Sequence, residues 1–260
     1  DPAAERRIVK EQSVAALIGG EVARGLTDEE LQRLLAGGLL IDVSTLRILE
    51  GRGLGELAGV RTGQRAGHCY ETFTEHFFNG TYAGDGRRAF PNATATGLEI
   101  IDPGVMVLSE AFRQEDDSRL GNCLTAFENS LGGRIAVASY APWEQLGRVG
   151  KRTQLLRLAS WLCRDRMPLE IESPVRVIPL IRGDGETGRV MVTLLHTALG
   201  DSGDFVVRLP LQATRVTLLS DSTRQSLAMA VTKRDTRMTI PSMKANSAAI
   251  LLIETSDQSE

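Results

Sequence analysis

The stretch from Leu26 to Val60 constrains the fold more than any other part of the chain, because helix and strand signals follow one another there without a gap. Thr27 and Glu30 have the spacing of a capping box, in which the threonine caps a helix and the glutamate bonds back to the cap. Gly37-Gly38 is predicted to end this helix with backbone at positive φ. The apolar stripe of the helix consists of Leu31, Leu34 and Leu35.

A buried strand and a second helix follow. The continuous apolar run at 39–42 is typical of a strand that is covered on both faces. Residues 43–50 are predicted to form a helix that ends at Gly51. Residues 13–20 resemble a further strand that ends in a glycine turn, and we expect it to lie parallel to 39–42. This β-α-β order indicates an α/β layer, but it identifies no reaction.

Composition excludes several classes of protein. The chain has 260 residues, enough for one large or two modest domains. Its 30 Lys and Arg and 33 Asp and Glu give a net charge of −3 without charge blocks, which argues against a nucleic-acid or anionic-membrane surface. Cys69, Cys123 and Cys163 have no paired spacing, so we expect reduced, mostly buried thiols.

The middle of the chain is less regular. From Arg61 to Pro91 the regular pattern gives way to Gly, Thr, aromatic and charged residues, and we predict an excursion or insertion over the edge of the sheet. Two glycosylation sequons, at Asn79 and Asn92, are interpreted as chance matches. Strands are expected at 97–101 and 105–109 with a turn at 102–104, and a strand pair at 123–129 and 134–139. A helix is expected at 151–163.

Beyond Pro168 the sequence changes to short runs of alternating apolar and polar residues, which are separated by turn residues. This pattern is typical of an antiparallel β-sandwich. We therefore predict two domains, an α/β domain at 1–167 and a β-sandwich at 168–260. The runs are at 175–178, 190–195, 205–209, 215–219, 227–231, 238–240 and 249–253.

Four stretches carry a family resemblance. They are the sequence of 26–60, the Asn-Ser-Leu-Gly-Gly-Arg-Ile-Ala-Val run at 129–137, the predicted helix that ends at Trp161-Leu162, and the Ser-Ala-Ala-Ile-Leu-Leu-Ile-Glu run at 247–254. Together they resemble the glutamine-amidotransferase-like domain of β-galactosidases and related glycoside hydrolases, often called the trimerisation domain, with its C-terminal sandwich. The resemblance covers most of the chain and rests on structural glycines and apolar runs.

The resemblance implies a flavodoxin-like (class I glutamine amidotransferase-like) layer that follows a catalytic barrel and makes subunit contacts. Such domains usually lack the amidotransferase nucleophile, and no cysteine here lies in a Gly-x-Cys-x-Gly elbow. The family has further elements before the position matching Ser13, so the first domain is expected to be incomplete at its N-terminus. The chain opens with a polar segment rather than Met, which we interpret as a processed chain or part of a longer protein.

No catalytic residue can be transferred from the family, because its catalytic carboxylates belong to the barrel. Glu110, Glu128 and Glu144 have no spacing that links them as an acid and nucleophile pair. We expect structural or surface roles for these three glutamates.

Three fragments permit an alternative, a serine hydrolase of the chymotrypsin type. The Ile-Gly-Gly run at 18–20 resembles the N-terminal sequence of such proteases, the Gly-His-Cys run around His68 their histidine segment, and the Gly-Asp-Ser-Gly run around Ser202 their nucleophile loop. Asp102 would complete the triad. Ser202 would attack a carbonyl, His68 would take its proton, and Asp102 would orient the imidazole. The predicted helices do not suit two β-barrels, and Gly-Asp-Ser-Gly is also good turn chemistry.

A second alternative is a carbohydrate-binding module. Trp143 follows a proline and lies near Tyr140, so the two rings could form a sugar-stacking platform. Aromatic residues beside a strand end are more often part of a core or an interface. This platform is therefore the minority interpretation.

We predict that the chain is the non-catalytic C-terminal region of a β-galactosidase-like hydrolase, which supports assembly and the active site. The chain alone is expected not to be catalytic. Its expected partners are an upstream catalytic domain, carbohydrate through that parent enzyme, and further copies in a homo-oligomer, with no nucleic acid or membrane. No cofactor or metal is expected. Without a signal peptide in this chain, we expect a cytoplasmic protein.

Overall fold

The computed structural model describes residues 15–65, 67–86, 95–145, 148–164, 167–173, 175–184, 189–220 and 223–255, without the side chains of 143, 144 and 184. The chain divides into two compact units, residues 1–165 and 166–260. Whether 1–167 and 168–260 are separate domains in the sense of folding independently stays a prediction. None of the described helices is long and apolar enough to cross a membrane.

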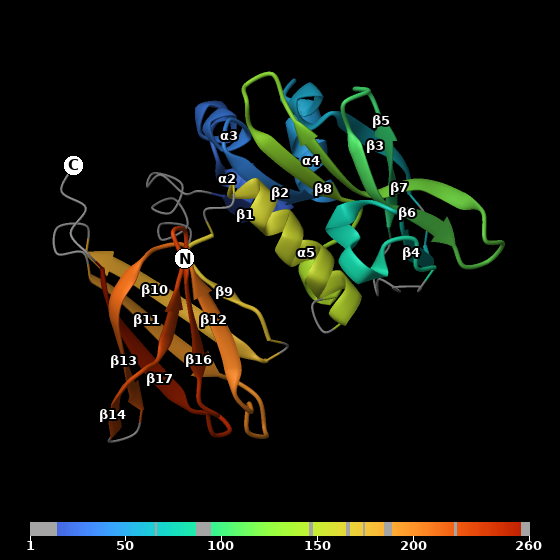
Figure 1. Ribbon diagram of the computed structural model, residues 1–260. Coiled ribbons are helices and arrows are strands. Elements are labelled where there is room, and N and C mark those ends of the chain that lie inside the picture. The colour runs from blue at the N-terminus through green and yellow to red at the C-terminus, as the bar shows by residue number, and fades with distance from the viewer. Residues whose placement is uncertain are drawn as a thin grey trace. The chain divides into compact units, whose positions relative to one another are not determined.

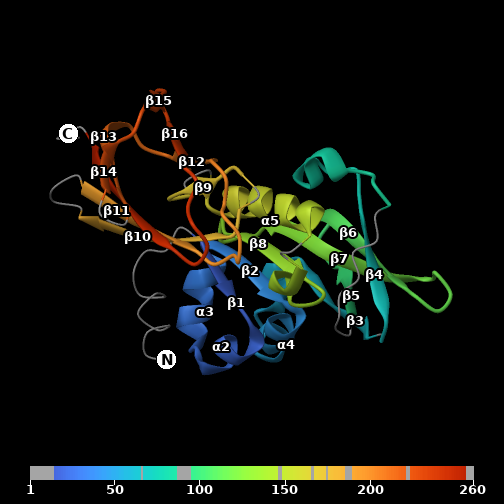
Figure 2. The same ribbon diagram turned by 90° about the horizontal axis from the view of Figure 1, so that it is seen from below.

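The first unit is built on a mixed sheet of eight strands (Figures 1 and 2). Its path is β1-β2-β8-β7-β5-β3, and it branches at β7, which also pairs with β6, while β6 pairs with β4. β1, β2 and β8 are parallel, and the remaining pairs are antiparallel. The strands are Ala16–Ile18 (β1), Gly38–Asp42 (β2), Val60–Arg65 (β3), Cys69–Phe73 (β4), Thr96–Ile100 (β5), Met106–Arg113 (β6), Arg119–Glu128 (β7) and Arg134–Ala138 (β8).

Helices cover both faces of the parallel strands. Leu39 and Ile41 of β2 join one apolar cluster with α2, α3 and α4, whereas Leu40 joins a second cluster with α5. β8 alternates in the same way, and Figure 2 shows α5 on the face opposite to α2, α3 and α4. The helices are Gly20–Gly25 (α2), Asp28–Leu35 (α3), Val43–Gly51 (α4) and Val149–Leu162 (α5), with the 3-10 helices Gly55–Ala58 (η1), Phe77–Tyr82 (η2) and Pro142–Gln145 (η3).

The local signals at 26–60 are confirmed with one correction. Thr27 Oγ1 accepts a hydrogen bond from Glu30 N at 3.3 Å, and Glu30 Oε2 accepts one from Thr27 N at 2.9 Å, which completes the capping box. Neither Gly37 nor Gly38 has a positive φ. A Cβ on Gly38 would instead lie 2.2 Å from Leu162 O, so this glycine permits close packing of β2 against the end of α5.

The excursion predicted at 61–91 is wrong where two strands of the sheet lie, and residues 66 and 87–91 are outside the described residues. β3 pairs with β5 from Val60↔Ile100 to Arg65↔Thr96, and β4 pairs with β6 from Cys69↔Arg113 to Phe73↔Ser109. The period-2 signal is weak in β3 because, among the described strands, it pairs with β5 alone, and most of its side chains are partly or fully exposed. The pairs at 123–129 and 134–139 and the helix near 151–163 are confirmed. Asn92 and the first residues of the predicted 13–20 strand lie outside the described residues.

The second unit consists of two antiparallel sheets. A five-stranded sheet has the order β10-β11-β17-β13-β14, and a four-stranded sheet has the order β15-β16-β12-β9. Their inner faces share one apolar cluster that includes Val192, Leu251, Phe205 and Ile240. The strands are Glu170–Ile171 (β9), Val177–Asp184 (β10), Arg189–His196 (β11), Phe205–Leu209 (β12), Ala213–Ser220 (β13), Thr223–Ser226 (β14), Met229–Val231 (β15), Thr236–Ile240 (β16) and Ala248–Thr255 (β17).

The seven predicted runs of this half each overlap a strand, and the sandwich is confirmed. β9 escaped prediction because it has only two residues, and β14 because its four side chains are all polar. The chain is therefore rich in strand, with one mixed sheet and two antiparallel sheets.

Candidate functional site

An ion pair is buried inside the first unit. Lys151 lies in the first turn of α5, and its Nζ donates to Glu71 Oε1 on β4 at 2.7 Å. Both side chains are 0% exposed. Because removing two charges from water is costly, such a pair persists only when further hydrogen bonds satisfy it.

The remaining acceptor capacity of Glu71 is used by two hydroxyl groups. Ser109 Oγ on β6 donates to Oε1, and Tyr140 OH donates to Oε2 at 2.6 Å. Hydrogen bonds to a charged oxygen are roughly twice as strong as neutral ones. The Tyr140 ring also lies beside the ammonium group, with its centroid 5.2 Å from Lys151 Nζ.

Two amides extend these contacts to η2. Lys151 Nζ donates to Gln154 Oε1 at 2.7 Å, and Gln154 Nε2 donates to Asn79 Oδ1 at 2.6 Å. Asn79 Nδ2 donates to the carbonyl oxygens of Thr74 at 2.7 Å and Leu108 at 2.8 Å. We call the side chains of Glu71, Asn79, Ser109, Tyr140, Lys151 and Gln154 the buried polar network. It joins α5, η2 and two strands of the sheet.

The buried polar network also bears on the glycosylation sequon at Asn79. Asn79 is 0% exposed, and both groups of its amide are hydrogen-bonded. A glycan on this side chain would require the fold to open, because sequon asparagines that carry sugar lie at the surface. The interpretation of Asn79 as a chance match therefore has a structural reason.

Burial holds the neighbouring acids in their neutral forms. Burial raises the pKa of the Cys123 thiol, and the negative charge of Glu71 adds to this effect. Burial also raises the pKa of Tyr140 well above its usual value, again with a smaller contribution from Glu71. Since the thiolate is the nucleophilic form of cysteine, Cys123 is a poor nucleophile in this environment.

The buried polar network is arranged to hold α5, η2 and the sheet together rather than to perform catalysis. Each of its six side chains is at most 3% exposed, so none can contact a dissolved ligand while the unit is closed. Each also has a protein partner for its polar atoms.

The three triad residues do not form a triad in the structure. His68 lies beside the Arg113 end of β6, where its carbonyl oxygen accepts from Gln114 N. Asp102 lies at the other end of β6, in the turn before Val105, and its Oδ1 accepts from Gly104 N at 2.7 Å. The eight residues of β6 span about 26 Å at a rise of ~3.3 Å per residue, which is too far for Asp102 to orient His68.

Ser202 belongs to the second unit and occupies the segment between β11 and β12. Its Oγ donates to Gly203 O at 2.7 Å and accepts from Met243 N at 2.9 Å. Asp201 Oδ1 accepts from Ala245 N at 3.2 Å. These contacts are those of a turn that holds the segment near 243–245.

Tyr140 and Trp143 do not offer a described stacking surface. Tyr140 is 3% exposed and its hydroxyl is bound to Glu71, so its ring belongs to the interior. The side chain of Trp143 lies outside the described residues. A carbohydrate contact by Trp143 stays a prediction.

The glutamates have ordinary surface partners. Glu110 accepts from Arg119 Nε at 2.8 Å, and Glu128 accepts from Arg134 Nε at 3.3 Å. The side chain of Glu144 is not described. No group of three or more His, Cys, Asp or Glu side chains within the described ranges is placed to hold a metal ion. The three cysteines are free and buried.

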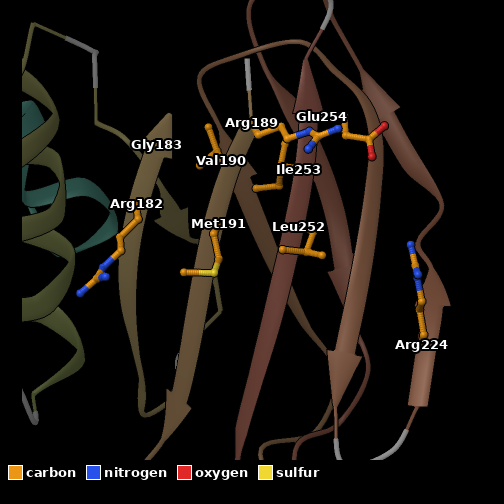
Figure 3. A pocket seen from close by; sticks show the side chains of 9 residues that line it. All are labelled: Arg182, Gly183, Arg189, Val190, Met191, Arg224, Leu252, Ile253 and Glu254. Atoms are coloured by element: carbon orange, nitrogen blue, oxygen red, sulfur yellow. The ribbon is translucent and has the colours of Figure 1, made fainter. Parts of the chain in front are cut away.

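The second unit has an open trough of about 560 Å³ on its five-stranded sheet (Figure 3). Met191 and Leu252, which face each other on neighbouring strands, form its apolar floor. Arg182 and Arg224 flank it from the two edge strands. Arg189 and Glu254, a cross-strand pair, form one end.

Sequence reasoning missed the buried polar network and the trough. A signal for Lys151 was present, because Lys151, Gln154, Leu155 and Leu158 recur at the spacing of one helix face. No comparable signal exists for Glu71, whose burial depends on the pairing of β4 with β6.

Comparison with solved structures finds the same fold within larger glycoside hydrolases. An α-L-fucosidase, isoenzyme 2, from Paenibacillus thiaminolyticus superposes with a TM-score of 0.64 at 13% identity, over 94% of this chain and 40% of that one. A β-galactosidase from Bacillus circulans sp. alkalophilus gives 0.51 at 12% identity, over 92% and 32%. A cold-adapted β-galactosidase from Rahnella sp. R3 gives 0.51 at 13% identity, over 91% and 31%.

The chain thus spans at most 40% of these three enzymes. At such identities the likeness is one of fold. No protein-family model matches the chain. No curated protein matches it either.

Proposed function

We propose that this chain is the non-catalytic C-terminal region of a β-galactosidase-like glycoside hydrolase, where it serves assembly and supports the active site. The proposal rests on the share of each chain that the structural superpositions cover. More than nine tenths of this chain superposes on each of three glycoside hydrolases, but on no more than 40% of any one of them. A region shared in this way is expected to act together with the remainder of such an enzyme.

The first unit would be a flavodoxin-like layer of the glutamine-amidotransferase type, as in trimerisation domains. Its parallel strands β1-β2-β8, with helices on both faces, support this proposal. The raised pKa of Cys123 agrees with a layer that lacks the amidotransferase nucleophile.

The proposed mechanism is burial of apolar surface between subunits or against an upstream catalytic domain. Such burial contributes about 25 cal/mol per Å², from which the cost of association is subtracted. Large apolar side chains are available for it, since Leu17 is 55% exposed and Phe77 is 63% exposed. Carbohydrate would be a partner only through the parent enzyme.

We also propose a cytoplasmic location. The three free, buried cysteines support a reducing compartment, because secreted proteins usually pair their cysteines. Labelling of free thiols in the unfolded natural protein, followed by peptide mapping, would test this: the peptides that contain Cys69, Cys123 and Cys163 should each be labelled without prior reduction.

Activity measurement tests the central proposal. The purified chain should not hydrolyse nitrophenyl galactoside or fucoside, because the acid and nucleophile of such enzymes would lie outside it. Glycoside turnover that persists through repurification would contradict the proposal. The serine hydrolase is tested separately: Ser202 would take a fluorophosphonate label that a Ser202→Ala variant loses.

A second experiment addresses the natural polypeptide. An antibody against the α3–α4 region should detect, in the source organism, a protein well above the 28.2 kDa of this chain. A band at 28.2 kDa would indicate a free-standing protein and contradict the parent-enzyme proposal.

A further inference from the structure

The outer face of the five-stranded sheet departs from the usual pattern of an antiparallel sheet. Inner positions such as Val192 and Leu251 are fully buried in the sandwich core. Outer positions should then be polar, because antiparallel sheets commonly leave one face to water. Here Leu180 is 52% exposed, Ile178 is 50% exposed and Leu252 is 36% exposed.

These apolar residues lie together. The register places Arg182 opposite Met191 and Met191 opposite Leu252, so an apolar centre crosses β11 and β17. On the same face of β10, Leu180 lies two residues from Arg182 and opposite Thr193, which is two residues from Met191. We call the side chains of Ile178, Leu180, Met191 and Leu252, with the trough of Figure 3, the outer sheet face.

The rim of this face is positively charged. Arg182 and Arg224 stand on the edge strands, and Arg189 and Arg215 stand on either side of Glu254 in one cross-strand row. Two arginines thus flank Glu254, and Asp184 lies opposite Arg189 in the same row, whereas Arg182 lies in the row of Leu252 and Arg224 in the row of Ile250. Four arginines therefore stand against two acidic residues at this rim. No ion pair joins any of the four to another residue within the described ranges.

An apolar centre with an arginine rim is the anatomy of a protein interface, in which Met and Arg are enriched. We propose that the outer sheet face docks an acidic polypeptide segment whose apolar side chains cover Leu180, Met191 and Leu252 while its carboxylates pair with the arginines. Charge selects this partner, because the fork of an arginine matches a carboxylate. This inference does not depend on the proposed hydrolase function.

Two other occupants fit less well. A second copy of the same face would bring four arginines and two acidic residues against the same set, so most of the facing charges would be alike, and like charges across an interface are unfavourable. An acidic saccharide would meet the arginines, but the floor of the trough offers only the flexible aliphatic side chains of Met191 and Leu252. Aromatic rings are the amphipathic surfaces that suit sugars better.

Fluorescence anisotropy with the full chain tests the proposal. The probe is a labelled peptide of alternating Leu and Glu, compared with one of alternating Ser and Glu and one of alternating Leu and Lys. The Leu-Glu peptide should bind at least about tenfold more tightly than the others, because it alone supplies both apolar and acidic groups. Its affinity should fall as salt rises from about 0.05 to 0.5 M.

Paired variants locate the site. Arg182→Glu with Arg189→Glu, and separately Leu180→Ser with Leu252→Ser, should each weaken binding about tenfold. Lys233→Glu and Leu199→Ser are the matched controls, since both residues are exposed in turns away from this face, and they should leave binding unchanged. Unfolding curves confirm that each variant is folded.

Three outcomes would overturn the proposal. The Leu-Glu peptide does not bind, or it binds the face variants as well as the controls. Alternatively, polygalacturonate displaces the probe and binds with dependence on the arginines alone, which would identify an acidic-saccharide site.

Discussion

Each unit contains an ion pair between a basic side chain and a glutamate on a strand. The pair of the first unit is buried, whereas the pair of the second unit is partly exposed to water. Lys151 and Glu71 in the first unit are 0% exposed, and their nitrogen and oxygen lie 2.7 Å apart. Arg208 and Glu170 in the second unit are each 28% exposed, and Arg208 also lies 3.6 Å from Asp235. Glu170 raises the pKa of Arg208 by its hydrogen bond and charge.

The difference in exposure implies that the two ion pairs contribute differently to the stability of their units. In the first unit a polar network replaces part of an apolar core, so every member depends on the others. In the second unit the core is apolar, the charges lie at the surface, and water substitutes for a lost partner. Similar pairs should therefore have unequal effects on folding.

The largest effect is expected for Lys151→Met. It leaves the Glu71 carboxylate buried without a cation, which costs about 3–5 kcal/mol in the free energy of unfolding. Urea unfolding followed by tryptophan emission measures this, because both tryptophans, Trp143 and Trp161, belong to the first unit.

The double variant Lys151→Met with Glu71→Gln is the control. It removes both charges and keeps an amide oxygen for Tyr140, so it should be more stable than Lys151→Met alone. If the double variant is as unstable as the sum of two single changes, the pair contributes no coupling and the comparison fails.

Tyr140→Phe should cost less, about 1.5–3 kcal/mol, because one hydrogen bond to the charged Glu71 is lost. The variant should also change the pH dependence. Burial, and to a smaller extent Glu71, raises the folded pKa of Tyr140 above the unfolded value of about 10. Above that pH the native state holds a proton that the unfolded state has lost, so stability falls as pH rises.

The wild-type protein should therefore lose stability above pH of about 10 more steeply than Tyr140→Phe does. Unfolding curves at several alkaline pH values measure both slopes. Equal slopes would show that the Tyr140 hydroxyl is not held protonated by the fold.

Much of the fold could be predicted because its signals are local. The Thr27 and Glu30 capping box, the apolar 39–42 run and the alternating runs after Pro168 all depend on neighbours in sequence. The strands β3 and β4 could not be recognised, because their membership in the sheet depends on partners such as β5 and β6 more than 30 residues away.

The candidate sites were less predictable for the same reason. Glu71 and Lys151 are 80 residues apart, and neither has a motif. Asn129 shows the reverse case. Its run carries part of the sequence resemblance, and in the structure Asn129 Nδ2 donates to Leu35 O, while Oδ1 accepts from Gly133 N. The amide thus fixes the turn before β8, which sequence alone could not reveal.

Glu170→Gln should have a small effect, at most about 1 kcal/mol. Arg208 keeps Asp235 and Glu172 within ion-pair distance, at 3.6 and 3.9 Å, and water reaches the site. Because the second unit has neither Trp nor Tyr, calorimetry or amide exchange of its strands is the suitable measurement. A loss as large as that of Lys151→Met would remove the contrast between the two pairs.

The smallest effect on folding is expected for Leu180→Ser, although the same type of side chain is essential elsewhere in that unit. Leu251, on the inner face, is 0% exposed, and Leu251→Ala should cost about 2–5 kcal/mol. Leu180 is 52% exposed on the outer sheet face, so its replacement should change the free energy of unfolding by no more than about 0.5 kcal/mol. Calorimetry of both variants measures the ratio, and a large loss for Leu180→Ser would mean that the fold itself covers this face and that no partner is needed.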